Sequence, residues 1–162
     1  MHDSTKHNPP ATGWLSLICR VLLGGLFIFA GILKLGKPQG FADAIMGFKM
    51  FDVDAHSHII VTLTYVIPWT EIVAGTFLVL GLWARASAAV IVSMLTAFIV
   101  GVISVIVRGI DTKCSCFGEL EWPCTGGVGW CQVVRNCVMI AMAIPVFFYG
   151  GGSLAVGKRS AE

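Results

Sequence analysis

The chain has 162 residues, of which 56% are hydrophobic and only 12% are charged. Soluble domains carry about 25% charged residues, because water has to hydrate their surface. The composition therefore excludes a water-soluble globule and indicates a protein embedded in a lipid bilayer. The net charge of +2 is too small to indicate a nucleic-acid partner, and the length allows one domain.

Four long apolar runs divide the sequence. They cover about residues 13–35, 59–82, 86–107 and 128–149. Each has roughly the twenty residues that an α-helix needs to cross about 30 Å of hydrocarbon. We predict an all-α fold, a four-helix transmembrane domain over residues 13–150. A disordered tail at 1–12 precedes it, and a polar tail at 151–162 follows it.

The segment between the first two runs contains a short amphipathic pattern. Phe41, Ile45 and Phe48 recur at helical spacing after Pro38, which predicts a short helix lying in the membrane interface. Further on, acidic and histidine side chains alternate in a pattern that a metal can use. We interpret this stretch as a solvated loop, because nothing fixes its geometry. Its polar residues are Asp52, Asp54, His56 and His58.

Small residues are placed where helices can approach one another closely. Gly24 with Gly31, and Ala74 with Gly75, offer such surfaces on the first and second predicted helices. The third predicted helix has a longer stripe of small residues, spaced four apart. It consists of Ala89, Ser93, Ala97 and Gly101. We predict that these positions serve helix packing and not chemistry.

Three ionisable side chains fall inside the predicted spans: Arg20, Glu71 and Arg135. Such groups are expensive in a bilayer, so they pair, face the bundle interior or bind a ligand. Antiparallel neighbours would bring Arg20 and Glu71 together, near a kink at Pro68. Two interpretations remain: an ion pair that fixes helix register, or a ligand or proton site. We expect Lys34, near a helix end, to reach the membrane interface.

Four cysteines lie between and beside the third and fourth predicted helices: Cys114, Cys116, Cys124 and Cys131. Four cysteines allow three pairings. A Cys114–Cys116 disulfide would close a small ring that is easily reduced, which is typical of a redox-active pair. Arg135 follows Cys131 by one helical turn and would favour its thiolate form.

Three interpretations of this cysteine-rich loop stay open. In the first, its disulfides are purely structural. In the second, it exchanges disulfides with a thioredoxin-like protein or passes electrons to a quinone. In the third, it holds a metal. The spacing C-x-C-x7-C-x6-C lacks the two-residue interval usual in zinc and iron–sulfur sites, so we predict no metal site. Cys19 and Cys137 lie within apolar runs and are interpreted as packing residues.

Basic residues do not decide the orientation, because four lie on each side of the predicted membrane. The cysteines do favour one orientation, since paired cysteines persist in an oxidising compartment. We therefore place the cysteine-rich loop outside the cytoplasm and both termini inside it, in the cytoplasmic membrane of a bacterium.

Several motifs, taken in order, resemble a known family. The opening Arg20-x-x-x-Gly24 with Phe29-Ala30-Gly31-x-x-Lys34-Leu35, and then Pro68-x-x-Glu71-x-x-x-Gly75, is similar to DoxX-type membrane proteins. Cys114-Ser115-Cys116-Phe117-Gly118, followed by Arg135-Asn136, resembles the methylamine-utilisation MauE branch. The usual form there is C-G-C-F-G and then R-N, so Ser115 replaces a glycine and restricts the backbone between the thiols.

The resemblance implies a four-helix bundle broadly like DsbB and vitamin K epoxide reductase. It also implies a role in maturing a disulfide-rich protein alongside a thioredoxin-like partner, with quinone as a candidate electron acceptor. By analogy, Cys114 and Cys116 would exchange disulfides, and Cys124 and Cys131 would be a second pair. Arg20, Glu71 and Arg135 are the candidate quinone-binding residues. The alternative hypothesis is a non-catalytic subunit of a larger membrane complex, with static disulfides.

Overall fold

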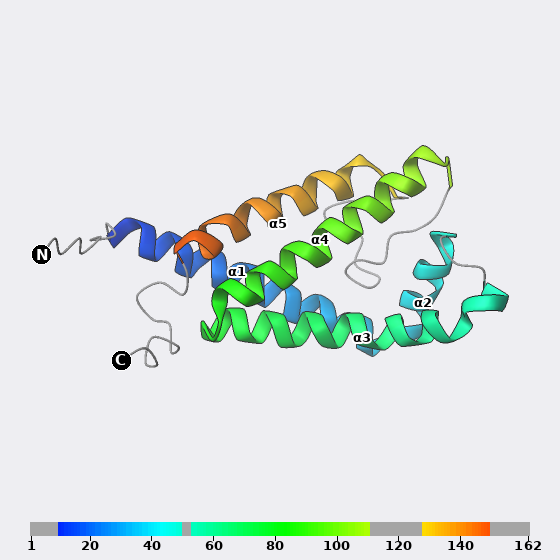
Figure 1. The fold of residues 1–162 in the computed structure, drawn as a ribbon, viewed down its shortest axis with the longest axis horizontal. Coiled ribbons are helices and arrows are strands. Elements are labelled where there is room, and N and C mark those ends of the chain that lie inside the picture. Colours follow the sequence, from blue (N-terminus) through cyan, green and yellow to red (C-terminus); the bar gives the residue numbers. More distant parts are fainter. Residues whose placement is uncertain (1–9, 50–52, 111–127, 150–162) are drawn as a thin grey trace, which may run out of the picture.

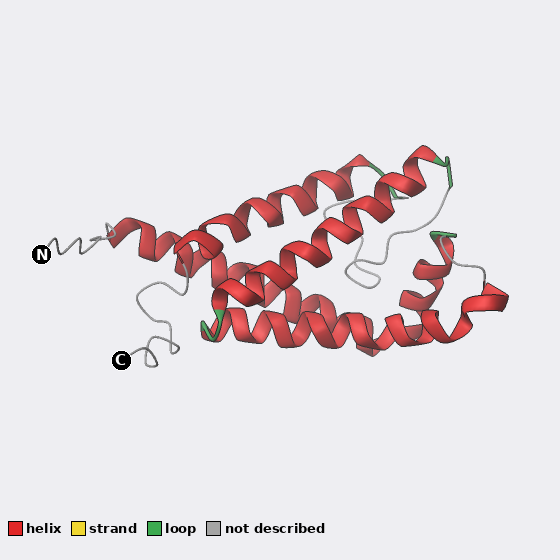
Figure 2. Cartoon of the chain, in the orientation of Figure 1, coloured by secondary structure: helices red, strands yellow, loops and turns green. Residues whose placement is uncertain are grey.

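The computed structural model describes residues 10–49, 53–110 and 128–149. These residues form helices and short connections, without a strand in the described ranges, which confirms the all-α prediction (Figure 2). The five helices are α1 (Pro10–Gly36), α2 (Pro38–Gly47), α3 (Val53–Leu80), α4 (Ala84–Val107) and α5 (Trp130–Tyr149). Residues 10–12, predicted as part of the N-terminal tail, belong to α1. The rest of that tail, the predicted C-terminal tail and residues 111–127 lie outside the described residues.

Four of these helices are long and apolar enough to cross a membrane. The candidate spans are Trp14–Gly36, Ser57–Leu80, Ala84–Val107 and Trp130–Phe148. They agree with the four runs read from the sequence, and α2 is the short helix predicted after the first span. The chain is a multi-pass membrane protein, and the lipid bilayer is its surroundings.

The four long helices form a ring in the order α1, α3, α4, α5. Helix α1 packs against α3 and α5, and α4 packs against the same two helices. Side chains from all four meet in one buried cluster, which includes Leu23, Leu78, Ile91 and Val146. The end of α1 and the starts of α3 and α5 lie at one end of the bundle, together with the end of α4 (Figure 1). We refer to this as the cysteine-loop end.

Glycines bring α1 and α3 into backbone contact. A Cβ atom on Gly24 would lie 2.8 Å from the carbonyl oxygen of Gly75, and one on Gly31 would lie 2.8 Å from that of Pro68. Real Cβ atoms do not approach backbone this closely, so Gly24 and Gly31 have no room for a side chain. The predicted use of these glycines for helix packing is confirmed. The contacts also fix the register of the two helices.

At the cysteine-loop end, α3 extends beyond the last residue of its neighbour α1. Gly31 faces Pro68, and α1 stops five residues later, whereas α3 begins fifteen residues before Pro68. At 1.5 Å per residue, α3 extends roughly 15 Å beyond α1. Helix α2 packs against α3 in this region (Figure 1) and buries Phe41 and Ala44.

The start of α3 at Val53 corrects one prediction. Residues 54–58, interpreted as a solvated loop, are helical, because the helical pattern of α3 extends beyond the membrane-spanning run.

A second tie joins α2 to the end of α4. The Arg108 guanidinium donates hydrogen bonds to the carbonyl oxygens of Phe48, at 3.4 Å, and Lys49, at 3.1 Å. The rings of Phe48 and Phe98 meet edge to face, with centroids 6.1 Å apart. The C-terminal end of α2 is therefore attached to α4.

The small-residue stripe of α4 is not a packing surface within this chain. Gly101 is buried, but Ala89, Ser93 and Ala97 are exposed. The buried side of α4 instead carries larger residues, such as Ile91 and Val102. The periodicity was read correctly as helical, but three of the four residues point away from the bundle.

Candidate functional site: a buried charge cluster within the helix bundle

A buried ion pair joins α1 to α3. The Lys34 ammonium donates a hydrogen bond to Oε1 of Glu71, and the two residues are only 5% and 7% exposed. The ring of Phe41, from α2, lies over the ammonium, with 5.1 Å between Nζ and the ring centroid. This distance is within the range of a cation–π interaction. Three helices thus converge on one charged pair.

The pair overturns two expectations about Lys34 and Glu71. Lys34 was predicted to reach the membrane interface, but α1 ends beside the middle of α3, and α2 covers the lysine. Glu71 was predicted to meet Arg20. Because Gly24 faces Gly75, Arg20 lies one turn further along α1, beyond that contact. Arg20 and Lys34 are fourteen residues apart, or about 21 Å along α1, so Glu71 is out of reach of Arg20.

Glu71 lies deep in its span, nine residues from the end of α3 and fourteen from Ser57. Pro68 precedes it by one turn and has no backbone N–H to offer the carbonyl of Thr64. Thr64 is buried, and its hydroxyl donates to the carbonyl of Ile60 at 2.7 Å. Helix α3 continues through the proline. This stretch of α3 therefore places polar groups inside the membrane-spanning part of the helix.

One oxygen of Glu71 has no hydrogen-bond partner in the part of the chain that the structure describes. Its Oε2 is buried and makes no hydrogen bond with the residues that the structure describes. Buried polar atoms are nearly always hydrogen-bonded, so this atom is an open acceptor within the bundle.

Arg135, on α5, belongs to the same cluster. It is half-buried and acts on Lys34 as a nearby like charge. The first turns of α5 around it are polar. Gln132 accepts a hydrogen bond from the Gly129 N–H at 2.8 Å, the return half of a capping box, and Asn136 donates to the Gln132 carbonyl at 2.7 Å. These bonds fix the start of α5 at the cysteine-loop end.

Cys131 is the second residue of α5 and is disulfide-bonded. Its partner lies outside the described residues, as do Cys114, Cys116 and Cys124. Cys19 and Cys137 are free thiols, the first packed against the core and the second exposed on the lipid-facing side of α5.

The predicted ligand-binding residues do not form one site. Lys34, near the end of α1, and Arg135, near the start of α5, lie on the side of the cysteine-loop end, and Glu71 meets Lys34 from the interior of α3. Arg20 lies nearer the other end of α1 and is 3% exposed. In place of Arg20, Lys34 completes the cluster. Lys34 follows Gly31 by three residues, and residues at this spacing share a helix face. This spacing was the available signal that Lys34 faces α3.

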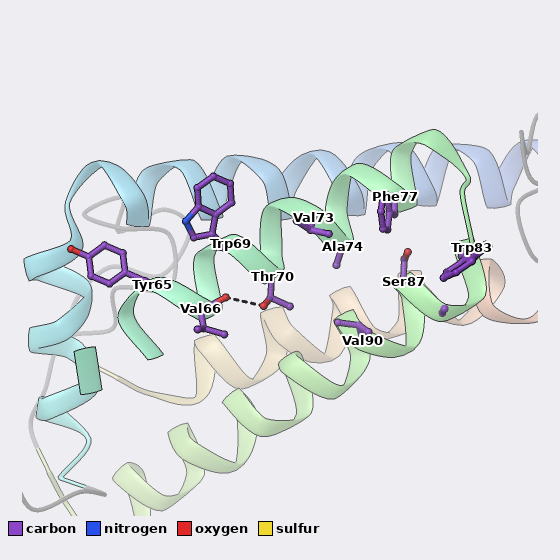
Figure 3. A pocket seen from close by; sticks show the side chains of 11 residues that line it. Tyr65, Val66, Trp69, Thr70, Val73, Ala74, Phe77, Trp83, Ser87 and Val90 are labelled. Carbon is purple, nitrogen blue, oxygen red and sulfur yellow. Dashed lines mark hydrogen bonds between the residues drawn. The ribbon is translucent and has the colours of Figure 1, made fainter. Parts of the chain in front are cut away.

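A groove opens on the other side of α3, between α3 and α4. Its volume is about 540 Å³, and aromatic residues of α3 and of the α3–α4 turn line it: Tyr65, Trp69, Phe77 and Trp83 (Figure 3). The Thr70 hydroxyl in this groove donates to the Val66 carbonyl at 2.8 Å. The groove therefore presents an almost wholly apolar surface to the bilayer. Among the described residues, no group of three metal-binding side chains occurs.

Sequence comparison identifies the family. The family model of the methylamine utilisation protein MauE matches residues 12–149. The chain belongs to this family. The match confirms the resemblance read from the motifs, and it spans all four transmembrane helices of this MauE-family protein together with every candidate site residue. No match was found among curated proteins or among solved structures.

Proposed function

We propose that this MauE-family protein is a redox accessory of the bacterial cytoplasmic membrane, which exchanges disulfides with an extracytoplasmic thioredoxin-like protein. The disulfide of Cys131 carries the proposal. It lies at the start of α5, one turn from Arg135, which acts electrostatically on Lys34 of the buried Lys34–Glu71 pair. A disulfide one turn from a charge that acts on the buried pair supports the proposal.

Cys114 and Cys116 exchange with the partner, and Cys124 and Cys131 form the second pair. In each exchange a thiolate attacks a disulfide sulfur, one S–S bond breaks and another forms. The net transfer is two electrons and two protons from one dithiol to one disulfide. A quinone in the bilayer accepts the electrons from the second pair.

The orientation follows from the same chemistry. Disulfides persist outside the cytoplasm, so the cysteine-loop end faces the extracytoplasmic side. With four spans, both termini then lie in the cytoplasm.

Thiol trapping in intact membranes tests this function. An alkylating mass tag and peptide mass spectrometry report the redox state of each cysteine, with and without mild reductant. We expect Cys114 and Cys116 to shift between oxidised and reduced forms while the protein stays folded. Replacing both with serine should change the thiol status of the partner in cells, whereas Cys137→Ser, a free thiol on the lipid-facing side, should leave it unchanged. Loop cysteines that react only after denaturation would contradict the proposal.

The groove between α3 and α4 favours a second candidate function, a structural subunit of a larger membrane complex. An apolar, aromatic groove of this kind suits a transmembrane helix of another subunit. Copurification separates the two candidates. A stoichiometric complex that survives detergent, with loop cysteines insensitive to mild reductant, would replace the redox function with this one.

A further inference from the structure

The Lys34–Glu71 pair has hydrogen-bonding capacity that the described residues do not use. Glu71 accepts from Lys34 through Oε1, and its buried Oε2 has no partner among these residues. An unmet acceptor is costly in a bilayer, where no bulk water replaces the missing donor. The open oxygen therefore points to a hydrogen-bond donor that comes from a ligand.

Lys34 contributes the complementary group. An ammonium carries three donors, and one of them is used by Glu71. The buried ring of Phe41 covers the ammonium from the side of α2. A polar ligand at this place meets the remaining ammonium donors, the open carboxylate oxygen and the ring of Phe41.

We propose that Lys34 and Glu71 bind the polar ring substituent of the quinone acceptor, an inference that rests on the proposed function. In the oxidised ligand, a carbonyl oxygen accepts from the Lys34 ammonium. In the reduced ligand, a hydroxyl donates to Oε2 of Glu71. A group that alternates between carbonyl and hydroxyl finds a partner in the same ion pair in both states.

The position of the pair suits electron transfer from the loop cysteines. Arg135 acts electrostatically on Lys34 and follows Cys131 by one turn of α5. The ligand site therefore lies inside the bundle, beside the end of α1, where α1, α2 and α3 meet. Arg20, about 21 Å away along α1, has no part in it.

The overall reaction balances with a quinone as oxidant. One dithiol and one quinone give one disulfide and one hydroquinone. Two S–H bonds are lost, one S–S bond forms, and two electrons and two protons move to the acceptor. Lys34 and Glu71 lie where they can exchange those protons with the ligand oxygen.

Ligand binding to the purified full-length protein tests the proposal independently of turnover. Decylubiquinone and decylubiquinol serve as probes, and the thermal unfolding midpoint in detergent is the readout, because a ligand bound to the folded state raises it. We expect both probes to raise the midpoint of the unaltered protein. In the double variant Lys34→Met/Glu71→Met, affinity should fall roughly ten- to one-hundredfold, as expected for lost hydrogen bonds to charged groups.

The double variant should fold, because apolar replacements of both members of a buried pair are often neutral or stabilising. Thr64→Val is the matched control. It removes another buried polar group of α3, two turns away, and should bind both probes as the unaltered protein does. A double variant that binds within twofold of the unaltered protein overturns the proposal, and so does an unaltered protein without any shift.

The variant Cys114→Ser/Cys116→Ser separates this inference from the proposed function. It should still bind both probes. If the loop cysteines change redox state in cells but the Lys34→Met/Glu71→Met variant binds the probes normally, only the proposed quinone site is wrong. If probe binding depends on the Lys34–Glu71 pair but the loop cysteines never change redox state, the proposed function is wrong and the ligand site is still supported.

Discussion

Helix α3 makes two very different contacts with its neighbours in the ring. Towards α1 it approaches to backbone distance at Gly24, Gly31 and Gly75, and it forms the buried ion pair beside them. Towards α4 it leaves the apolar groove lined by Trp69 and Phe77 (Figure 3).

The difference teaches how a membrane bundle is held together. Lipid tails are as apolar as the side chains, so burial alone gives little stability, and close packing and polar pairs carry the association. The α1–α3 contact should therefore be rigid and sensitive to substitution. The α3–α4 groove should tolerate change.

The largest expected effect comes from breaking the ion pair. Glu71→Met leaves the Lys34 ammonium buried without its partner, which should lower the free energy of unfolding by roughly 3–5 kcal/mol. Unfolding in mixed micelles measures this change. The double variant Lys34→Met/Glu71→Met should regain most of the loss. Equal losses in the single and double variants would show that the unpaired Lys34 ammonium is not the cause of the loss.

A smaller effect is expected from adding one methyl group between α1 and α3. In Gly75→Ala the new Cβ would lie 2.7 Å from the Gly24 carbonyl oxygen, and this overpacking should cost roughly 1–3 kcal/mol. Gly25→Ala is the matched control, since a Cβ there meets no atom within 4 Å. It should stabilise the helix by up to about 1 kcal/mol, because alanine favours helices over glycine. If the two substitutions change the free energy of unfolding in opposite directions, the tight contact at Gly75 is confirmed. Equal changes in both variants refute it.

The smallest effect is expected in the groove. Phe77→Ala removes a ring that is 42% exposed to the bilayer, so the free energy of unfolding should change by less than about 1 kcal/mol. Its neighbour Leu78 is fully buried in the core cluster, and Leu78→Ala should cost roughly 2 kcal/mol or more through lost packing. If Phe77→Ala lowers the free energy of unfolding as much as Leu78→Ala does, another molecule or segment must cover the groove.

The site was only partly predictable, and Arg20, Lys34 and Glu71 show why. Each was recognised as an ionisable residue in or beside an apolar run. Their pairing depended on the axial register of two antiparallel helices. The prediction aligned the helix ends, but α1 stops about 15 Å short of α3. This offset pairs Glu71 with Lys34 and leaves Arg20 at the other end.

The sequence by itself determined the four spans, the short α2 and the family, because lipid demands long apolar helices and motif order is a property of the chain. Tertiary structure alone decided which charges meet, which atoms each packing glycine faces and which side of α4 is exposed. Periodicity defines the faces of one helix, but it does not determine which face is buried or the axial offset between that helix and its neighbour. Packing of α2 against α3 and the glycine contacts of α1 set those quantities here.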